Sequence, residues 1–131
     1  SNCRELAFTM RNLTDDQIRG VAKTGGVVGV NSVNLFAHAE KEDSDVKDLV
    51  DHVDHIAKLV GIDHVGIGFD ICNTFVNYLQ MEESIVAYDI ISHHSKLDSF
   101  TAELVNRKYS DDEILAVLGG NFSRVYTEIL D

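Results

Sequence analysis

The chain has 131 residues, of which 44% are hydrophobic and 25% charged. This length and composition predict a globular protein in which residues 1–131 form one domain unit with no internal boundary. The 22 acidic and 11 basic residues give a net charge of −11, and so acidic a surface disfavours nucleic-acid binding. No apolar run reaches the ~18 residues that span a bilayer, and no signal peptide is visible, which favours a cytoplasmic location.

The first predicted helix begins after Thr14. Residues 14–17 read Thr-Asp-Asp-Gln, a capping box in which the first and last side chains bond each other's backbone N–H groups. Apolar residues then recur at helical spacing, and Gly25 follows the last turn. The run at 27–30 is apolar and rich in valine, which is typical of a strand buried on both faces of a parallel sheet.

The longest helix is predicted over residues 46–60, after a polar loop at 34–43. Apolar residues repeat there every three or four positions, with Ser44 as the expected cap and Gly61 at the end. This helix follows one predicted strand and precedes another, so it is placed to connect them as a crossover.

The second buried strand is predicted at 64–69 and leads directly into Asp70. Gly66 and Gly68 lie within it, where glycine allows another backbone to approach closely. A carboxylate directly after a buried parallel strand lies where ligand sites form in α/β folds. Asp70 is therefore a candidate site residue on sequence grounds alone.

The remaining elements are predicted to be helical. A weak pattern suggests a helix at 82–91, and a clearer one predicts a helix at 97–106. A second capping box opens a helix over 110–118, the glycines at 119–120 end it, and Asn121 is the expected cap of the last helix.

Alternation of helices and strands favours right-handed βαβ units around a parallel sheet, an α/β fold. Two strands, however, cannot make a sheet that helices cover on both faces. We therefore expect that the chain is one part of a larger α/β fold whose other strands lie elsewhere.

Cysteines and histidines form no clear framework. Cys3 and Cys72 are too few for a disulfide scaffold and are expected to be buried free thiols. His52 and His55 have a spacing that could bind zinc on one face of a helix, but a solvated helix face is the favoured interpretation. The adjacent histidines at 93–94 would point in different directions on any regular element, which favours structural or surface roles.

Several segments, in order and at compatible spacing, match one known family. They are residues 11–19, 24–31, 51–56, 61–70, 109–114 and 118–125. In these segments the chain resembles the membrane (renal) dipeptidase family of zinc peptidases. The resemblance covers nearly the whole chain and is weakest at 71–96.

The resemblance implies a fold and a cofactor. The family folds as a (β/α)8 TIM-type barrel of the amidohydrolase type, which usually needs ~250 residues, with two zinc ions at the carboxyl ends of its strands. The chain would then be the C-terminal part of the barrel, with strand seven at 27–30 and strand eight at 65–69. The family's metal ligands would lie upstream of Ser1. No metal ligand is therefore assigned within this chain, and the isolated chain is expected to be inactive.

Two site residues carry over from the resemblance, and the barrel that it implies adds a weak third candidate. Arg11 matches the arginine that holds the free carboxylate of a dipeptide, a task that suits a guanidinium fork. Asp70 matches the aspartate that ends strand eight and would move a proton from the attacking water to the leaving amine. His38, in the loop after strand seven, is a weaker candidate for lining the substrate pocket.

Some positions depart from the family pattern. The family commonly reads Gly-Asp-Phe-Asp-Gly after strand eight, whereas residues 69–73 read Phe-Asp-Ile-Cys-Asn, and Met10 stands where a proline is frequent. The favoured interpretation is a zinc-dependent dipeptidase whose partners are a dipeptide and the upstream part of the same enzyme. A homo-oligomer is a further possible assembly. The alternatives are a non-catalytic stand-alone α/β binding module and an inactive relative of the dipeptidases.

Overall fold

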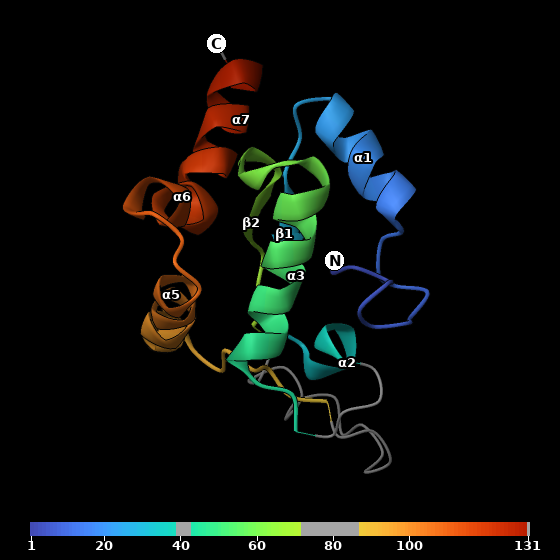
Figure 1. Cartoon of the computed structure of the whole chain (residues 1–131), viewed down its shortest axis with the longest axis vertical. Coiled ribbons are helices and arrows are strands. Elements are labelled where there is room, and N and C mark those ends of the chain that lie inside the picture. The colour runs from blue at the N-terminus through green and yellow to red at the C-terminus, as the bar shows by residue number, and fades with distance from the viewer. Residues whose placement is uncertain (39–42, 72–86, 131) are drawn as a thin grey trace.

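The structure is a computed structural model that describes residues 1–38, 43–71 and 87–130. No helix in these ranges is long and apolar enough to cross a membrane. Figure 1 shows helix α3 lying along the two strands, with α1 on one side of it and α5 and α6 on the other. The helices and strands are α1 (Asp15–Lys23), β1 (Val28–Val30), α2 (Asn34–Ala37), α3 (Val46–Val60), β2 (Val65–Ile67), α5 (Leu97–Asn106), α6 (Asp111–Leu115) and α7 (Asn121–Leu130).

Strands β1 and β2 pair in parallel, with Val28 opposite Val65 and Val30 opposite Ile67. Helix α3 connects them, so the predicted βαβ unit is confirmed and the described part of the chain is mixed α/β. Because parallel strands joined by a crossover run in the same direction, their carboxyl ends lie at the same edge of the sheet.

The core lies between α3 and one face of this strand pair. The apolar stripe of α3 and the valines of both strands are buried together in a single hydrophobic cluster. Full burial of one such aliphatic side chain contributes about 1.5–3 kcal/mol, so this contact fixes the helix on the sheet. The members contributed by α3 and the strands are Leu49, Val50, Val53, Ile56, Val28, Val30 and Val65.

The other face of the strand pair is made of glycine. A Cβ atom at Gly68 would lie 3.1 Å from the Gly29 Cα, so the two strands approach closely here, as the sequence predicted. A Cβ atom at Gly66 would lie 2.8 Å from the ring of Phe122, which comes from α7. Glycine therefore makes room both for the neighbouring strand and for an aromatic ring.

Substitution of Gly66 by Ala should destabilise the protein by about 1–3 kcal/mol, because the new methyl group overlaps the Phe122 ring. Urea denaturation would measure the change. Gly20→Ala is the control: a Cβ atom there meets nothing within 4 Å, and α1 gains about 1 kcal/mol of helix propensity. Equal stability of Gly66→Ala and the parent protein would contradict this account of the glycine face.

The predicted helix starts are largely confirmed. The Thr14 side chain accepts from the Gln17 N–H at 3.3 Å, and Ser110 caps α6 in the same way, so both capping boxes form. The cap of α3 was predicted wrongly. Asp45 rather than Ser44 accepts from the Lys47 N–H, at 2.7 Å. Carboxylate and hydroxyl oxygens both suit this position, so residue type could not choose between neighbours.

Three other predictions need correction. The expected loop at 34–43 begins as the short helix α2. Residues 82–86 of the weak predicted helix at 82–91 lie outside the described residues, and residues 87–91 are not helical, since Asp89 bridges to Val33. Asn121 does not stand before α7 as a cap but is its first residue.

Candidate active site at the carboxyl end of the strands

Asp70 lies where the chain leaves β2. Phe69 just before it is buried and packs edge to face against Phe100, with ring centroids 5.1 Å apart, which anchors the turn. Asp70 itself is exposed and has a φ of +57°, in the left-handed region that few residues other than glycine adopt. Backbone in such a conformation costs about 1–2 kcal/mol and is concentrated at functional sites. The turn places the Asp70 carboxylate just beyond the carboxyl end of β2, where the sequence analysis expected it.

Asn31 lies at the corresponding end of β1 and reaches Asp70. Its amide nitrogen donates to Asp70 Oδ2 at 3.1 Å, and its amide oxygen accepts from the Val33 N–H at 2.8 Å. Asn2 fixes the Asn31 backbone on both sides, by accepting from its N–H at 2.7 Å and donating to its carbonyl at 3.0 Å. These four hydrogen bonds hold a buried amide against an exposed carboxylate.

Arg11 lies on a turn that packs against α2. Its guanidinium carbon is 5.0 Å from the centroid of the Phe36 ring, a cation–π contact that contributes about 0.5–1 kcal/mol at an exposed site. The next residue, Asn12, is buried and donates to the carbonyls of Ala7 at 3.0 Å and Phe36 at 2.9 Å. The turn and the helix that hold Arg11 are therefore tied to each other.

The two halves of the site meet at Asn2. Its backbone N–H donates to Asn12 Oδ1 at 3.1 Å, so one chain of buried asparagines runs from the Arg11 turn to the end of β1. The Ser1 nitrogen donates to Gly29 O at 3.0 Å.

His38 follows α2 directly and is partly buried. Its Nδ1 atom is buried and has no hydrogen-bond partner in the structure as described. An unpaired buried nitrogen is uncommon and leaves a donor or acceptor for something else. Of the three predicted site residues, Asp70 is bonded by Asn31 at one end of the asparagine chain, Arg11 directly precedes Asn12 at the other end, and His38 follows α2.

A pocket of about 240 Å³ is lined by Asp70 and the residues around it. Apolar side chains from the end of β2 and the start of α5 line most of it, and His94 adds a second polar group beside Asp70. The pocket gives Asp70 a mixed apolar and polar surround that is typical of ligand sites.

His52 was predicted on a solvated helix face, and the structure corrects this. It is fully buried, its Nδ1 accepts from the Cys3 N–H at 3.1 Å, and its Nε2 bonds the Ala37 carbonyl at 2.9 Å. Burial lowers its pKa to about 4. The N-terminal segment and α2 cover this side of α3, which helical periodicity alone could not reveal.

Neither histidine of that helix is placed to act as a metal ligand. His55 pairs with Asp15 of α1, at 2.7 Å from Nε2 to Oδ1, while both ring nitrogens of His52 are used by backbone groups. Across residues 1–38, 43–71 and 87–130, no group of three or more His, Cys, Asp or Glu side chains is placed to hold a metal ion.

Cys3 is a buried free thiol as predicted, and burial raises its pKa to about 12. The same prediction for Cys72 falls outside the described residues.

Asn31 is the site residue that the sequence analysis missed. It directly follows the predicted strand at 27–30, as Asp70 follows the strand at 64–69. The strand-end argument that singled out Asp70 would have singled out Asn31 as well. Asn2 and Asn12 carry no such signal, because their partners are distant in sequence.

Known proteins resemble the chain along its whole length. An uncharacterized protein in the pqqA 5′ region of Klebsiella pneumoniae is 44% identical over 73 residues, or 53% of the chain, and dipeptidase ataJ of Aspergillus terreus is 30% identical over 127 residues, or 96% of it. A metallo peptidase from Rhodobacter sphaeroides, solved with a phosphinate mimic of the dipeptide L-Ala-D-Ala, matches 93% of the chain at a TM-score of 0.74 and 22% identity.

The chain spans 27% and 28% of the length of the two relatives and 32% of the solved chain. The profile of the membrane dipeptidase family, peptidase family M19, matches residues 1–131, the full length of the sequence. The chain therefore belongs to the membrane dipeptidase family of peptidases.

Proposed function

We propose that residues 1–131 are the C-terminal part of one (β/α)8 barrel domain of a zinc-dependent dipeptidase, in which β1 and β2 are strands seven and eight. The observation that carries the proposal is the contact between Asn31 and Asp70 at the carboxyl ends of two parallel strands, tied through Asn2 and Asn12 to the turn that holds Arg11. Family membership and the small share of each relative that the chain covers support it.

In this proposal Arg11 binds the free carboxylate of a dipeptide. Its guanidinium is exposed, and the Phe36 ring supports one side of it, which leaves N–H groups for a planar carboxylate. His38, in the segment that follows α2, is assigned to the lining of the substrate pocket, where its unpaired Nδ1 would be available to the substrate.

Asp70 carries the protons. Water adds to the carbonyl carbon of the peptide bond, and the Asp70 carboxylate accepts the proton that the water loses. The C–N bond then breaks, and Asp70 returns the proton to the leaving nitrogen, so that one dipeptide and one water become two amino acids.

The described residues do not by themselves form a metal site, since no three of their His, Cys, Asp or Glu side chains are grouped to hold an ion. When bound, zinc would activate the attacking water. Its ligands would come from the rest of the enzyme.

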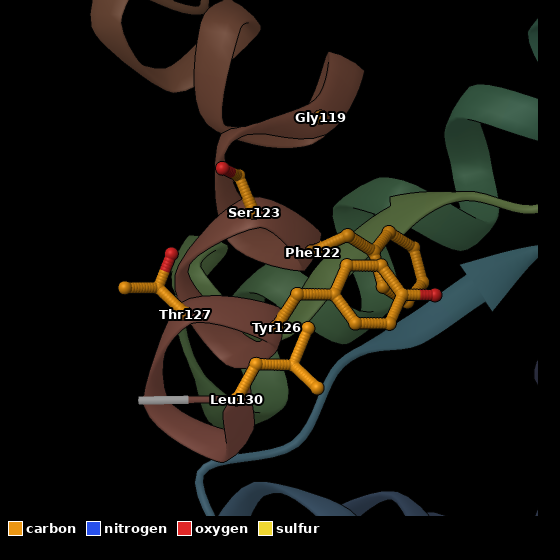
Figure 2. A pocket seen from close by; sticks show the side chains of 6 residues that line it. All are labelled: Gly119, Phe122, Ser123, Tyr126, Thr127 and Leu130. Atoms are coloured by element: carbon orange, nitrogen blue, oxygen red, sulfur yellow. The ribbon is translucent and has the colours of Figure 1, made fainter.

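The proposed partner of the chain is that remaining part of the same enzyme. Side chains of α7 line an open pocket of about 500 Å³. Figure 2 shows Phe122 and Tyr126 projecting from α7 toward the strands. Tyr126 and Leu130 are 61% and 81% exposed, so this side of α7 offers apolar surface for further packing.

Dipeptide hydrolysis by the complete zinc-loaded enzyme is the test. We expect turnover of dipeptides, little turnover of the same dipeptides with an amidated C-terminus, and none by the isolated chain. Arg11→Met should raise KM for dipeptides about 10- to 100-fold, since a charge-assisted bond to a carboxylate is worth about 1.5–3 kcal/mol.

Arg19→Met is the matched control, because Arg19 is an exposed arginine that pairs with Asp16 on α1. It should leave KM unchanged. An inactive complete enzyme would favour the inactive-relative alternative, and turnover by the isolated chain would contradict the role proposed for the missing part.

A further inference from the structure

We infer that Asn31 is a positioning residue that orients the Asp70 carboxylate for proton transfer. This inference deepens the proposed function and rests on it. It concerns a residue at the end of β1 that touches Asp70 directly and is itself held from three sides.

The first step concerns the two oxygens of Asp70. Oδ2 accepts from the Asn31 amide at 3.1 Å, whereas no group in the described ranges donates to Oδ1. Oδ2 is therefore anchored, while Oδ1 has no donor among residues 1–38, 43–71 and 87–130. A carboxylate that must accept and return a proton needs this arrangement, because the anchored oxygen fixes where the reacting oxygen points.

The second step concerns the orientation of the Asn31 amide. Its oxygen accepts from the Val33 N–H at 2.8 Å, so its nitrogen is the end that faces Asp70. Asn2 holds the backbone N–H and carbonyl of Asn31 at 2.7 and 3.0 Å. The donor is thus locked before any substrate arrives.

The third step is why an asparagine suits this place. Asn31 is 8% exposed, and a buried amide is costly unless its polar groups are bonded. Here the side-chain amide bonds the Val33 backbone N–H through its oxygen and Asp70 through its nitrogen. An amide also cannot gain or lose a proton near neutral pH, so it orients the carboxylate without competing for the proton that Asp70 moves.

The test is steady-state kinetics of the complete zinc-loaded enzyme with dipeptides. Asn31→Asp keeps the acceptor for the Val33 N–H and removes the donor to Asp70. We expect kcat to fall about 10- to 100-fold with KM and zinc content little changed, as for other residues that orient a catalytic group. Asn31→Ser also removes the amide donor but places no second carboxylate beside Asp70, and it should lower kcat as well.

Asn121→Ala is the matched control. Asn121 is also a buried asparagine, and it donates to the Ile62 and Val65 carbonyls, both at 2.8 Å, at the opposite end of β2. Its loss should lower the melting temperature while kcat is retained. A purely structural Asn31 would behave in the same way.

A double variant separates positioning from general damage. In an Asp70→Asn background, Asn31→Asp should cause no further fall in kcat, because the group it orients has lost its function. Unchanged kcat in both Asn31 variants would overturn the inference and leave the proposed function standing. So would an equal fall in kcat when Asn31→Asp is made in the parent enzyme and in the Asp70→Asn enzyme. If Asp70→Asn alone leaves kcat unchanged, the proton-transfer role fails first and the inference falls with it.

Discussion

The Asp70→Asn enzyme should hydrolyse dipeptides with a kcat about 10²- to 10⁴-fold below that of the parent protein, the range typical of losing a general acid–base group. The amide has almost the same shape as the carboxylate but cannot accept a proton from water. Since Arg11 and Phe36 are untouched, KM should change little. Steady-state kinetics with zinc analysis of the same samples would measure both quantities.

The local geometry lets Asp70→Asn remove the proton acceptor while the surrounding structure is kept. Asparagine tolerates the left-handed backbone that Asp70 adopts at a φ of +57°, so the turn after β2 can keep its shape. The new amide oxygen can still accept from Asn31 Nδ2, which preserves the contact to β1. A fall in kcat would therefore report the lost proton acceptor rather than a displaced loop.

Asp63→Asn serves as the control for this experiment. Asp63 is exposed in the short 3₁₀ turn Ile62–His64, at the opposite end of β2 from Asp70. Removal of its charge changes the net charge by the same amount and should leave kcat unchanged. Equal turnover by both variants and the parent would remove Asp70 from the mechanism.

Local signals in the sequence predicted most of the secondary structure. The capping boxes at Thr14 and Ser110 depend on residues three positions apart, and both form. The valine-rich run at 27–30 and the run at 64–69 contain the two strands, which pair as expected for a βαβ unit. Such features depend on neighbours along the chain, so a sequence can display them directly.

Contacts between distant segments were not predictable in the same way. His52 is buried because residues 15 and 49 positions away, Ala37 and Cys3, pack over its side of α3. The side chain of Asn121 was expected to cap its own helix but bonds two carbonyls near β2 instead. Polar residues of this kind look like surface residues until the elements that cover them are placed.

Replacement of His52 by Leu should destabilise the protein by about 2–5 kcal/mol at neutral pH. The variant leaves the Cys3 N–H and the Ala37 carbonyl buried without partners, and each such group costs about 1–3 kcal/mol. His52 joins the N-terminal segment to α2, and these two segments carry Arg11 and Phe36. We therefore expect dipeptide binding through Arg11 to weaken in this variant as well.

The same histidine should make stability depend on pH. Burial lowers the pKa of His52 from 6.5 to about 4. Its Nδ1 accepts a hydrogen bond from the Cys3 N–H, so a proton on Nδ1 would break this bond. Between these two values the unfolded chain binds a proton that the folded protein does not, so stability is complete above about pH 6.5 and falls as the pH drops toward 4. The full loss of stability is about 3 kcal/mol when the pKa of His52 falls from 6.5 to about 4 on folding.

Urea denaturation of the parent protein and His52→Leu at about pH 7.5 and about pH 4.5 would measure this effect. The variant lacks the titrating group, so the gap in free energy of unfolding between the two proteins should shrink by about 2–3 kcal/mol at the lower pH. Any loss of metal or protonation of carboxylates at acid pH affects both proteins and cancels in the difference. A gap that stays constant with pH would show that His52 is not the buried neutral link between the N-terminal segment and α2.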